Sequence, residues 1–150
     1  MREMLFRGKR VDTDEWVEGG LITGYDYLDE YPMDVIAPVD AVFYPHNEIS
    51  VMFLVNPETV GQYTGLTDKN GVKIFEGDIV DASDGWWGAS GPAGHDSPII
   101  KVEYDESVCG FAPFAIYDCD CDVYIYPDEC TVIGNIHDNP ELIGGDNNDK

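Results

Sequence analysis

The chain has 150 residues, 43% of them hydrophobic and 12% aromatic, enough for one domain, or one small domain with an extension, that needs no disulfide or metal for stability. Thirty acidic residues stand against eight Lys and Arg, so the formal net charge is −22, which argues against binding to nucleic-acid phosphates or to anionic lipid. The charge favours a basic protein partner, mimicry of a polyanion, or an acidic surface that only keeps the chain in solution.

The N-terminal residues lack the apolar run of a secretory signal, and no apolar stretch is long enough to span a membrane. We therefore expect the protein in the cytosol of a host cell, where its four cysteines stay reduced.

Short β-strands are expected in the N-terminal third. Residues 5–11 and 15–22 flank a polar turn, Asp12-Thr13-Asp14, as in a β-hairpin. Residues 26–38 are acidic and aromatic and contain two prolines, which indicates a loop or an irregular connection. Residues 41–44 and 49–55 are further strand candidates.

The strongest turn signals follow. Asn70-Gly71 predicts a tight turn because both residues tolerate positive φ. Gly77-Asp78 predicts a bend directly before the apolar pair Ile79-Val80, a pattern common at the first strand of small SH3-like barrels. The residues expected to define the turns of the fold are Gly61, Gly65, Asn70, Gly71, Gly77 and Asp78.

In the C-terminal half, residues 85–98 are rich in Gly and Pro and predict a long loop. Strands are expected at residues 99–104, 110–117, 123–126 and 131–136. Residues 138–143 predict one short turn of helix that begins at a proline. Residues 144–150 predict a disordered acidic tail.

Five blocks of the chain together resemble the YopX family of phage and prophage proteins. The blocks are residues 6–11, 15–19, 58–71, 74–80 and 132–142. The resemblance implies an SH3-type barrel in the C-terminal part and no established biochemical activity. We therefore expect a mainly β protein with little helix: an N-terminal β hairpin or extension (1–57), an SH3-like barrel (58–143) and the tail (144–150).

Two regions depart from the family pattern. The first turn is Asp12-Thr13-Asp14, where the family often has an Asn-Gly or Asp-Gly turn. The loop 85–98 and the segment 109–130 match no part of the family pattern. A function specific to this chain would therefore lie there.

The run Asp118-Cys119-Asp120-Cys121-Asp122 has the spacing of the first ligands of a calcium loop, and Glu129 falls at position 12. Position 6 must be Gly for the sharp turn, but it is Val123. The flanking residues also resemble strands rather than helices. This pattern argues against a calcium site.

A zinc site is disfavoured as well. Cys119 and Cys121 are separated by one residue, whereas zinc ligands usually pair at wider spacing, and neither Cys109 nor Cys130 has a neighbouring cysteine. The surrounding carboxylates also disfavour the thiolate form. An alternating strand with cysteines inward and carboxylates outward explains the run better.

Two His-Asp pairs, His95-Asp96 and His137-Asp138, are similar to those of metal phosphohydrolases. Both lie in segments marked by Gly or Pro rather than on helices, so coincidence is the better explanation. We predict no catalytic, cofactor-binding or metal-binding residue, and no cofactor.

The hypothesis from sequence is a phage or prophage accessory protein that binds an unknown protein with a basic surface, in one form as a decoy that mimics nucleic acid. Direct nucleic-acid or membrane binding is not expected. The candidate partner-binding residues are Asp118, Asp120, Asp122, Trp86 and Trp87; the Trp pair could equally cover one end of the barrel. The alternatives are a metal-dependent hydrolase and a structural or assembly component.

Overall fold

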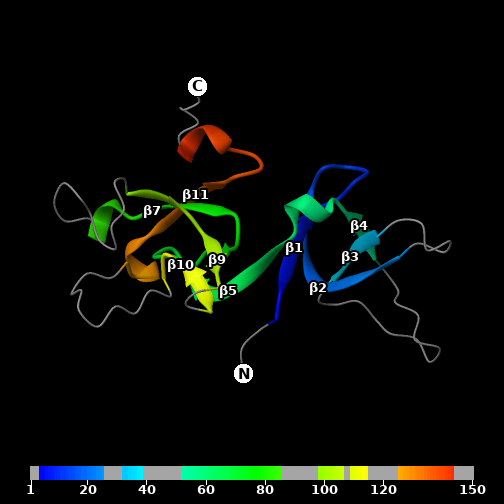
Figure 1. Ribbon diagram of the computed structural model, residues 1–150. Coiled ribbons are helices and arrows are strands. Elements are labelled where there is room, and N and C mark those ends of the chain that lie inside the picture. Colours follow the sequence, from blue (N-terminus) through cyan, green and yellow to red (C-terminus); the bar gives the residue numbers. More distant parts are fainter. Residues whose placement is uncertain are drawn as a thin grey trace. The chain divides into compact units, whose positions relative to one another are not determined.

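The computed structural model describes residues 4–25, 32–38, 52–85, 98–106, 109–114 and 125–143. The chain divides into two compact units, Met1–Tyr63 and Thr64–Lys150. The strands pair antiparallel, and the helical elements are short 3-10 turns (Figure 1). The mainly β fold expected from the sequence is therefore confirmed. Among the described residues, no helix is long and apolar enough to cross a membrane.

The N-terminal unit begins with the expected β-hairpin. Strands β1 (Phe6–Lys9) and β2 (Trp16–Tyr25) pair from Phe6↔Gly19 to Lys9↔Trp16. Asp14 has a φ of 62° in the connecting turn, and its N–H donates to the Arg10 carbonyl at 2.9 Å. Asp tolerates this left-handed conformation better than most residues, so it can occupy a turn position where Gly is often found.

Strand β3 (Pro32–Pro38) corrects the sequence-based expectation of a loop over residues 26–38. It pairs with β2 from Tyr25↔Pro32 to Gly19↔Pro38 and with β4 (Phe53–Val55) on its other side. The two prolines stand at the first and last positions of the strand, where a missing N–H interrupts the ladder least. The acidic part of that segment, residues 26–31, lies outside the described residues.

Strand β4 also returns to the end of β1. Arg10 and Val55 form an antiparallel bridge, the Val11 N–H donates to the Leu54 carbonyl at 3.0 Å, and the Asn56 N–H donates to the Lys9 carbonyl at 2.9 Å. A Cβ at Gly8 would lie 3.0 Å from the Val55 side chain, so this close approach favours glycine. These contacts place residues 10–12 beside residues 52–54.

The 3-10 turn η1 (Pro57–Thr59) then leads into β5 (Gly61–Thr67), which starts against β1 and runs into the C-terminal unit. There β6 (Lys73–Phe75) lies next to β5, and β11, β7 and β8 form a three-stranded sheet in that order. Strands β9 and β10 pair as a hairpin. The bounds are β7 Asp78–Asp81, β8 Ile99–Lys101, β9 Glu103–Asp105, β10 Gly110–Ala112 and β11 Thr131–Asn135, with 3-10 turns η2 Ser83–Gly85, η4 Pro127–Glu129 and η5 Pro140–Ile143.

Val102 divides the strand that was expected over residues 99–104. It is fully buried, its carbonyl accepts from the Gly77 N–H, and its N–H donates to the Asp78 carbonyl, both at 2.8 Å. The core of the unit consists of Ile74, Val80, Ala82, Ile100, Val102, Phe111, Ile125 and Cys130. Because the described strands form separate sheets, the closed SH3-like barrel over residues 58–143 stays a prediction.

Candidate functional site

A surface pocket of about 310 Å³ lies in the N-terminal unit, where the end of β1 meets β4. It is lined by Arg10, Val11, Asp12, Met52, Phe53 and Leu54. Three of these apolar side chains are unusually open to solvent: Val11 is 60% exposed, Met52 51% and Leu54 47%. The volume is near the lower end of the range of small-molecule sites, roughly 300–1,000 Å³.

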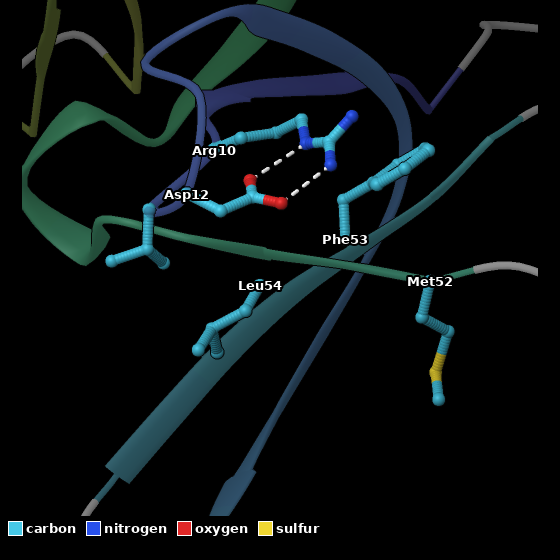
Figure 2. A pocket seen from close by; sticks show the side chains of 6 residues that line it. Arg10, Asp12, Met52, Phe53 and Leu54 are labelled. Atoms are coloured by element: carbon cyan, nitrogen blue, oxygen red, sulfur yellow. Dashed lines mark hydrogen bonds and ion pairs between the residues drawn. The ribbon is translucent and has the colours of Figure 1, made fainter.

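An ion pair fixes the polar side of this pocket. Arg10 Nε donates to Asp12 Oδ1 at 2.9 Å, and Nη2 donates to Oδ2 at 2.6 Å. The Arg10 guanidinium also lies 4.4 Å from the centroid of the Phe53 ring, and Figure 2 shows it between that ring and the Asp12 carboxylate. The hydrogen bond raises the pKa of Arg10 and lowers that of Asp12. Both groups therefore stay charged at neutral pH and largely cancel each other.

Sequence patterns do not identify this pocket. It indicated a turn at Asp12-Thr13-Asp14 and a strand over residues 49–55, but not that the two lie together. Val11, Met52 and Leu54 stand out only as apolar residues beside the predicted turn and in the predicted strand. Whether they face the core or the solvent depends on the register of β4 against Arg10 and Val11.

In the C-terminal unit, the predicted turn residues Asn70 and Gly71 lie between β5 and β6, and Gly71 has a φ of 81°. The buried Asp68 carboxylate accepts the N–H groups of Asn70 at 2.8 Å, Val72 at 2.9 Å and Val132 at 2.9 Å. Burial alone would raise the pKa of Asp68, but these N–H groups and Lys69 more than offset it, so the pKa lies below its ordinary value. Asp68 is a structural carboxylate that ties this turn to β11.

Gly77, at a φ of 92°, lies directly before β7, and Asp78 is the first residue of that strand. The Asp78 side chain is buried, and its Oδ2 accepts the Phe75 N–H at 2.8 Å. The Gly77 carbonyl accepts the Ile136 N–H at 2.9 Å, so two of the segments that carry the family resemblance meet at this bend. Gly77 and Asp78 therefore stabilise the backbone at this bend and do not offer a reactive group to solvent.

The other two glycines expected at turns lie within β5: Gly61 is its first residue, and Gly65 lies inside it with a φ of 86°. His137, of the second His-Asp pair, follows β11 in a turn where the Asn135 Oδ1 accepts the N–H groups of His137 at 3.0 Å and Asp138 at 2.9 Å. This turn is organised by an asparagine side chain.

Cys130 is buried, and burial raises its pKa to about 12, with further increases from Glu129, Asp81 and Asp128. Its thiol is therefore protonated at neutral pH, which disfavours attack by sulfur and metal binding alike. Cys109 is exposed. Within the described ranges, no group of three or more His, Cys, Asp or Glu side chains is arranged to hold a metal ion.

Several sequence-predicted candidates lie outside the described residues. They are Asp118, Asp120 and Asp122 with their two cysteines, the Trp86-Trp87 pair and His95-Asp96. The inward and outward assignment of the 118–122 run and the aromatic contact surface therefore stay predictions.

The surface of the C-terminal unit is strongly acidic. From Thr64 onward the sequence holds eighteen Asp and Glu against four Lys. Of the described acids in this unit, only Asp68 and Asp78 are buried. Lys69 Nζ lies 2.8 Å from Asp84 and Lys101 Nζ 3.0 Å from Glu103. With four Lys for eighteen acids, such pairs can neutralise only a small part of the negative charge.

Comparison with known proteins gives a family and a fold. A family model described as YopX protein matches residues 5–144. No curated protein matches the chain. Among solved structures, the chain is similar to the crystal structure of protein EF1440 from Enterococcus faecalis, with 26% identity and a TM-score of 0.52 over 95% of this chain and 99% of that one. The similarity extends over both units.

Proposed function

The chain belongs to the YopX family, and from this premise we propose that it is a phage or prophage accessory protein that binds a protein with a basic surface. In this proposal it acts without catalysis, in the cytosol of the host cell. Its carboxylates take the place of nucleic-acid phosphates and keep the partner from DNA or RNA.

The observation that carries this proposal is the excess of surface carboxylates. A net charge of −22 on 150 residues produces a long-range potential that attracts basic proteins and repels acidic ones. Burial removes few of these charges, because Asp68 and Asp78 are the buried acids among the described residues. A DNA-binding or RNA-binding protein presents the clustered cations that such a surface attracts.

We assign the partner contact to Asp118, Asp120 and Asp122, whose alternation with cysteines would place them in a row on one face of a strand. Trp86 and Trp87 would add apolar contact area, as aromatic residues commonly do at the centre of an interface. This assignment comes from the sequence alone.

The test begins with capture on the immobilised chain from a lysate of the host at about 50 mM and about 500 mM salt. We expect a basic protein that is held at low salt and released at high salt. The purified partner should then lose its bound DNA or RNA when the chain is added. Failure to recover any partner at low salt, or a partner that keeps its nucleic acid, contradicts the decoy.

A matched pair of variants tests the contact residues. Asp118→Asn with Asp120→Asn and Asp122→Asn removes three charges, and Glu103→Gln with Glu106→Gln and Glu141→Gln removes three from exposed positions elsewhere in the same unit. The first triple should weaken binding about tenfold or more beyond the second. Equal losses would mean that only total charge matters.

Two further measurements address the alternatives. Stoichiometric Mn, Zn or Mg in the purified protein would favour a metal-dependent hydrolase. A large regular oligomer in solution would favour a structural or assembly component.

A further inference from the structure

The pocket between the end of β1 and β4 is an apolar surface with a fixed polar rim. Val11, Met52 and Leu54 expose about half or more of their side chains around it, although each is a residue that folding normally buries. In Figure 2 the Met52 and Leu54 side chains extend away from the Arg10–Asp12 pair. A gathering of exposed apolar side chains rimmed by polar groups is typical of an interaction site.

Exposed carboxylates at and near the pocket can accept a partner's cation even though each is already paired. Arg10 of the lining is held by Asp12, and the preceding Lys9 has its Nζ 3.4 Å from Asp14, so both cations are already engaged by carboxylates. Those two carboxylates are themselves exposed. Each can accept further donors, because a carboxylate has about four acceptor positions.

Net charge disfavours other occupants of this surface. A second copy of the chain brings the same charge of −22, and lipid headgroups and nucleic acids are anionic as well, so all three are repelled. A protein segment that carries Lys or Arg beside an aliphatic side chain matches both features of the surface.

We infer that the pocket receives an aliphatic side chain from a basic partner segment, with the partner's Lys or Arg pairing with Asp12 and Asp14. This inference rests on the proposed function and adds to it an apolar contact that discriminates among basic partners. The acidic surface would attract cations generally, and the pocket would favour segments with Leu, Ile or Val next to the cations.

Two synthetic peptides of equal length and charge test it, one alternating Lys with Leu and the other Lys with Ser. Binding to the full chain is measured by calorimetry, and the contact is located by amide chemical shifts. We expect the leucine peptide to bind about tenfold more tightly, as burial of one aliphatic side chain implies. The shift changes that distinguish it from the serine peptide should centre on Val11, Met52 and Leu54.

The variant Met52→Ser with Leu54→Ser should abolish the advantage of the leucine peptide. The matched control is Val72→Ser in the C-terminal unit, because Val72 is 48% exposed and Leu54 is 47% exposed. All the substituted side chains are open to solvent, and circular dichroism confirms that each variant is folded.

The outcomes separate the two proposals. If both peptides bind in a salt-dependent manner but equally, or if the double variant keeps the preference for leucine, the pocket inference is wrong and the proposed function stands. If neither peptide binds the wild-type chain even at low salt, the attraction to basic partners fails, and the pocket inference fails with it.

Discussion

At the scale of single residues, the Asp68 carboxylate joins parts of the chain that are 64 residues apart, through its bond to the Val132 N–H. Its other oxygen holds the turn at Asn70 and Val72. N–H groups that donate to a buried carboxylate stabilise its charged form, and the carboxylate in turn stabilises the backbone that surrounds it. Removing that charge should therefore affect both the turn and β11.

We predict that Asp68→Asn lowers the free energy of unfolding by about 1–3 kcal/mol, since the new amide N–H₂ would face the Val132 N–H and leave that donor unsatisfied. Urea unfolding measures the change. Asp84→Asn is the control, because Asp84 is an exposed acid that pairs with Lys69 and its loss should change little. Equal effects of the two substitutions would contradict the structural role of Asp68.

The same carboxylate predicts a dependence on pH. The pKa of Asp68 is lower in the folded chain than its ordinary value, so its contribution is complete above the unfolded pKa of about 4 and is lost as the pH falls through the folded pKa. Asp68→Asn should consequently lose less stability than the wild type on acidification below about pH 4. Parallel pH profiles would rule out this linkage.

Residue-scale prediction from the sequence succeeded where the signal is local. Asn70-Gly71 and Gly77-Asp78 indicated bends, and Gly71 and Gly77 both adopt the positive φ that favours glycine. The bond from Val132 to Asp68 could not be predicted, because an Asp beside a turn gives no indication of which distant strand donates to it.

At the scale of elements, β11 is held at its C-terminal end by side chains that follow it. Asn135 Nδ2 donates to Asp138 at 3.1 Å, and the Asn139 Oδ1 accepts the Asn135 N–H at 3.3 Å. The Asn139 side chain packs over Gly134, where a Cβ would lie 2.5 Å from its Oδ1. Any larger residue at position 134 would therefore require the Asn139 side chain to shift.

We predict that Gly134→Ala destabilises the chain by about 1–3 kcal/mol, because the methyl group displaces Asn139 from its place over β11. Thermal unfolding and loss of amide protection at Asn135 measure the effect. Gly20→Ala in β2 is the control, since a Cβ there meets no atom within 4 Å. A Gly134→Ala chain as stable as Gly20→Ala would contradict the packing described.

The elements also show where sequence patterns fail. The hairpin of β1 and β2 was predictable because its turn and alternation are local. Strand β3 was missed because its two prolines indicate a loop, although at the ends of a strand they are tolerated. The pocket was missed because it depends on the pairing of Arg10 with Val55. These two residues lie far apart in the sequence, so no local pattern indicates that they pair.

At the scale of the whole molecule, one property, the charge of −22, should act in opposite directions on folding and on binding. Like charges repel one another within the folded chain and destabilise it. The same charges attract a basic partner. Salt weakens both interactions, since the screening length falls from about 30 Å at 0.01 M to about 8 Å at 0.15 M.

We therefore predict that the melting temperature rises as NaCl increases from about 10 mM to about 300 mM, by about 3 °C or more, which for a chain of this size is roughly 1 kcal/mol. Calorimetry at constant pH measures it. Over the same range, affinity for a basic partner should fall. A melting temperature that is flat or falls with salt would mean that self-repulsion does not limit the fold.

Magnesium chloride at matched ionic strength completes the experiment. Screening alone raises the melting temperature about equally in both salts, whereas a bound divalent ion adds a further increase that grows with its concentration. An equal response is what diffuse repulsion among the surface carboxylates requires. An extra increase with magnesium would instead mean that some carboxylates form a cation site, and the hydrolase alternative would then outweigh the decoy.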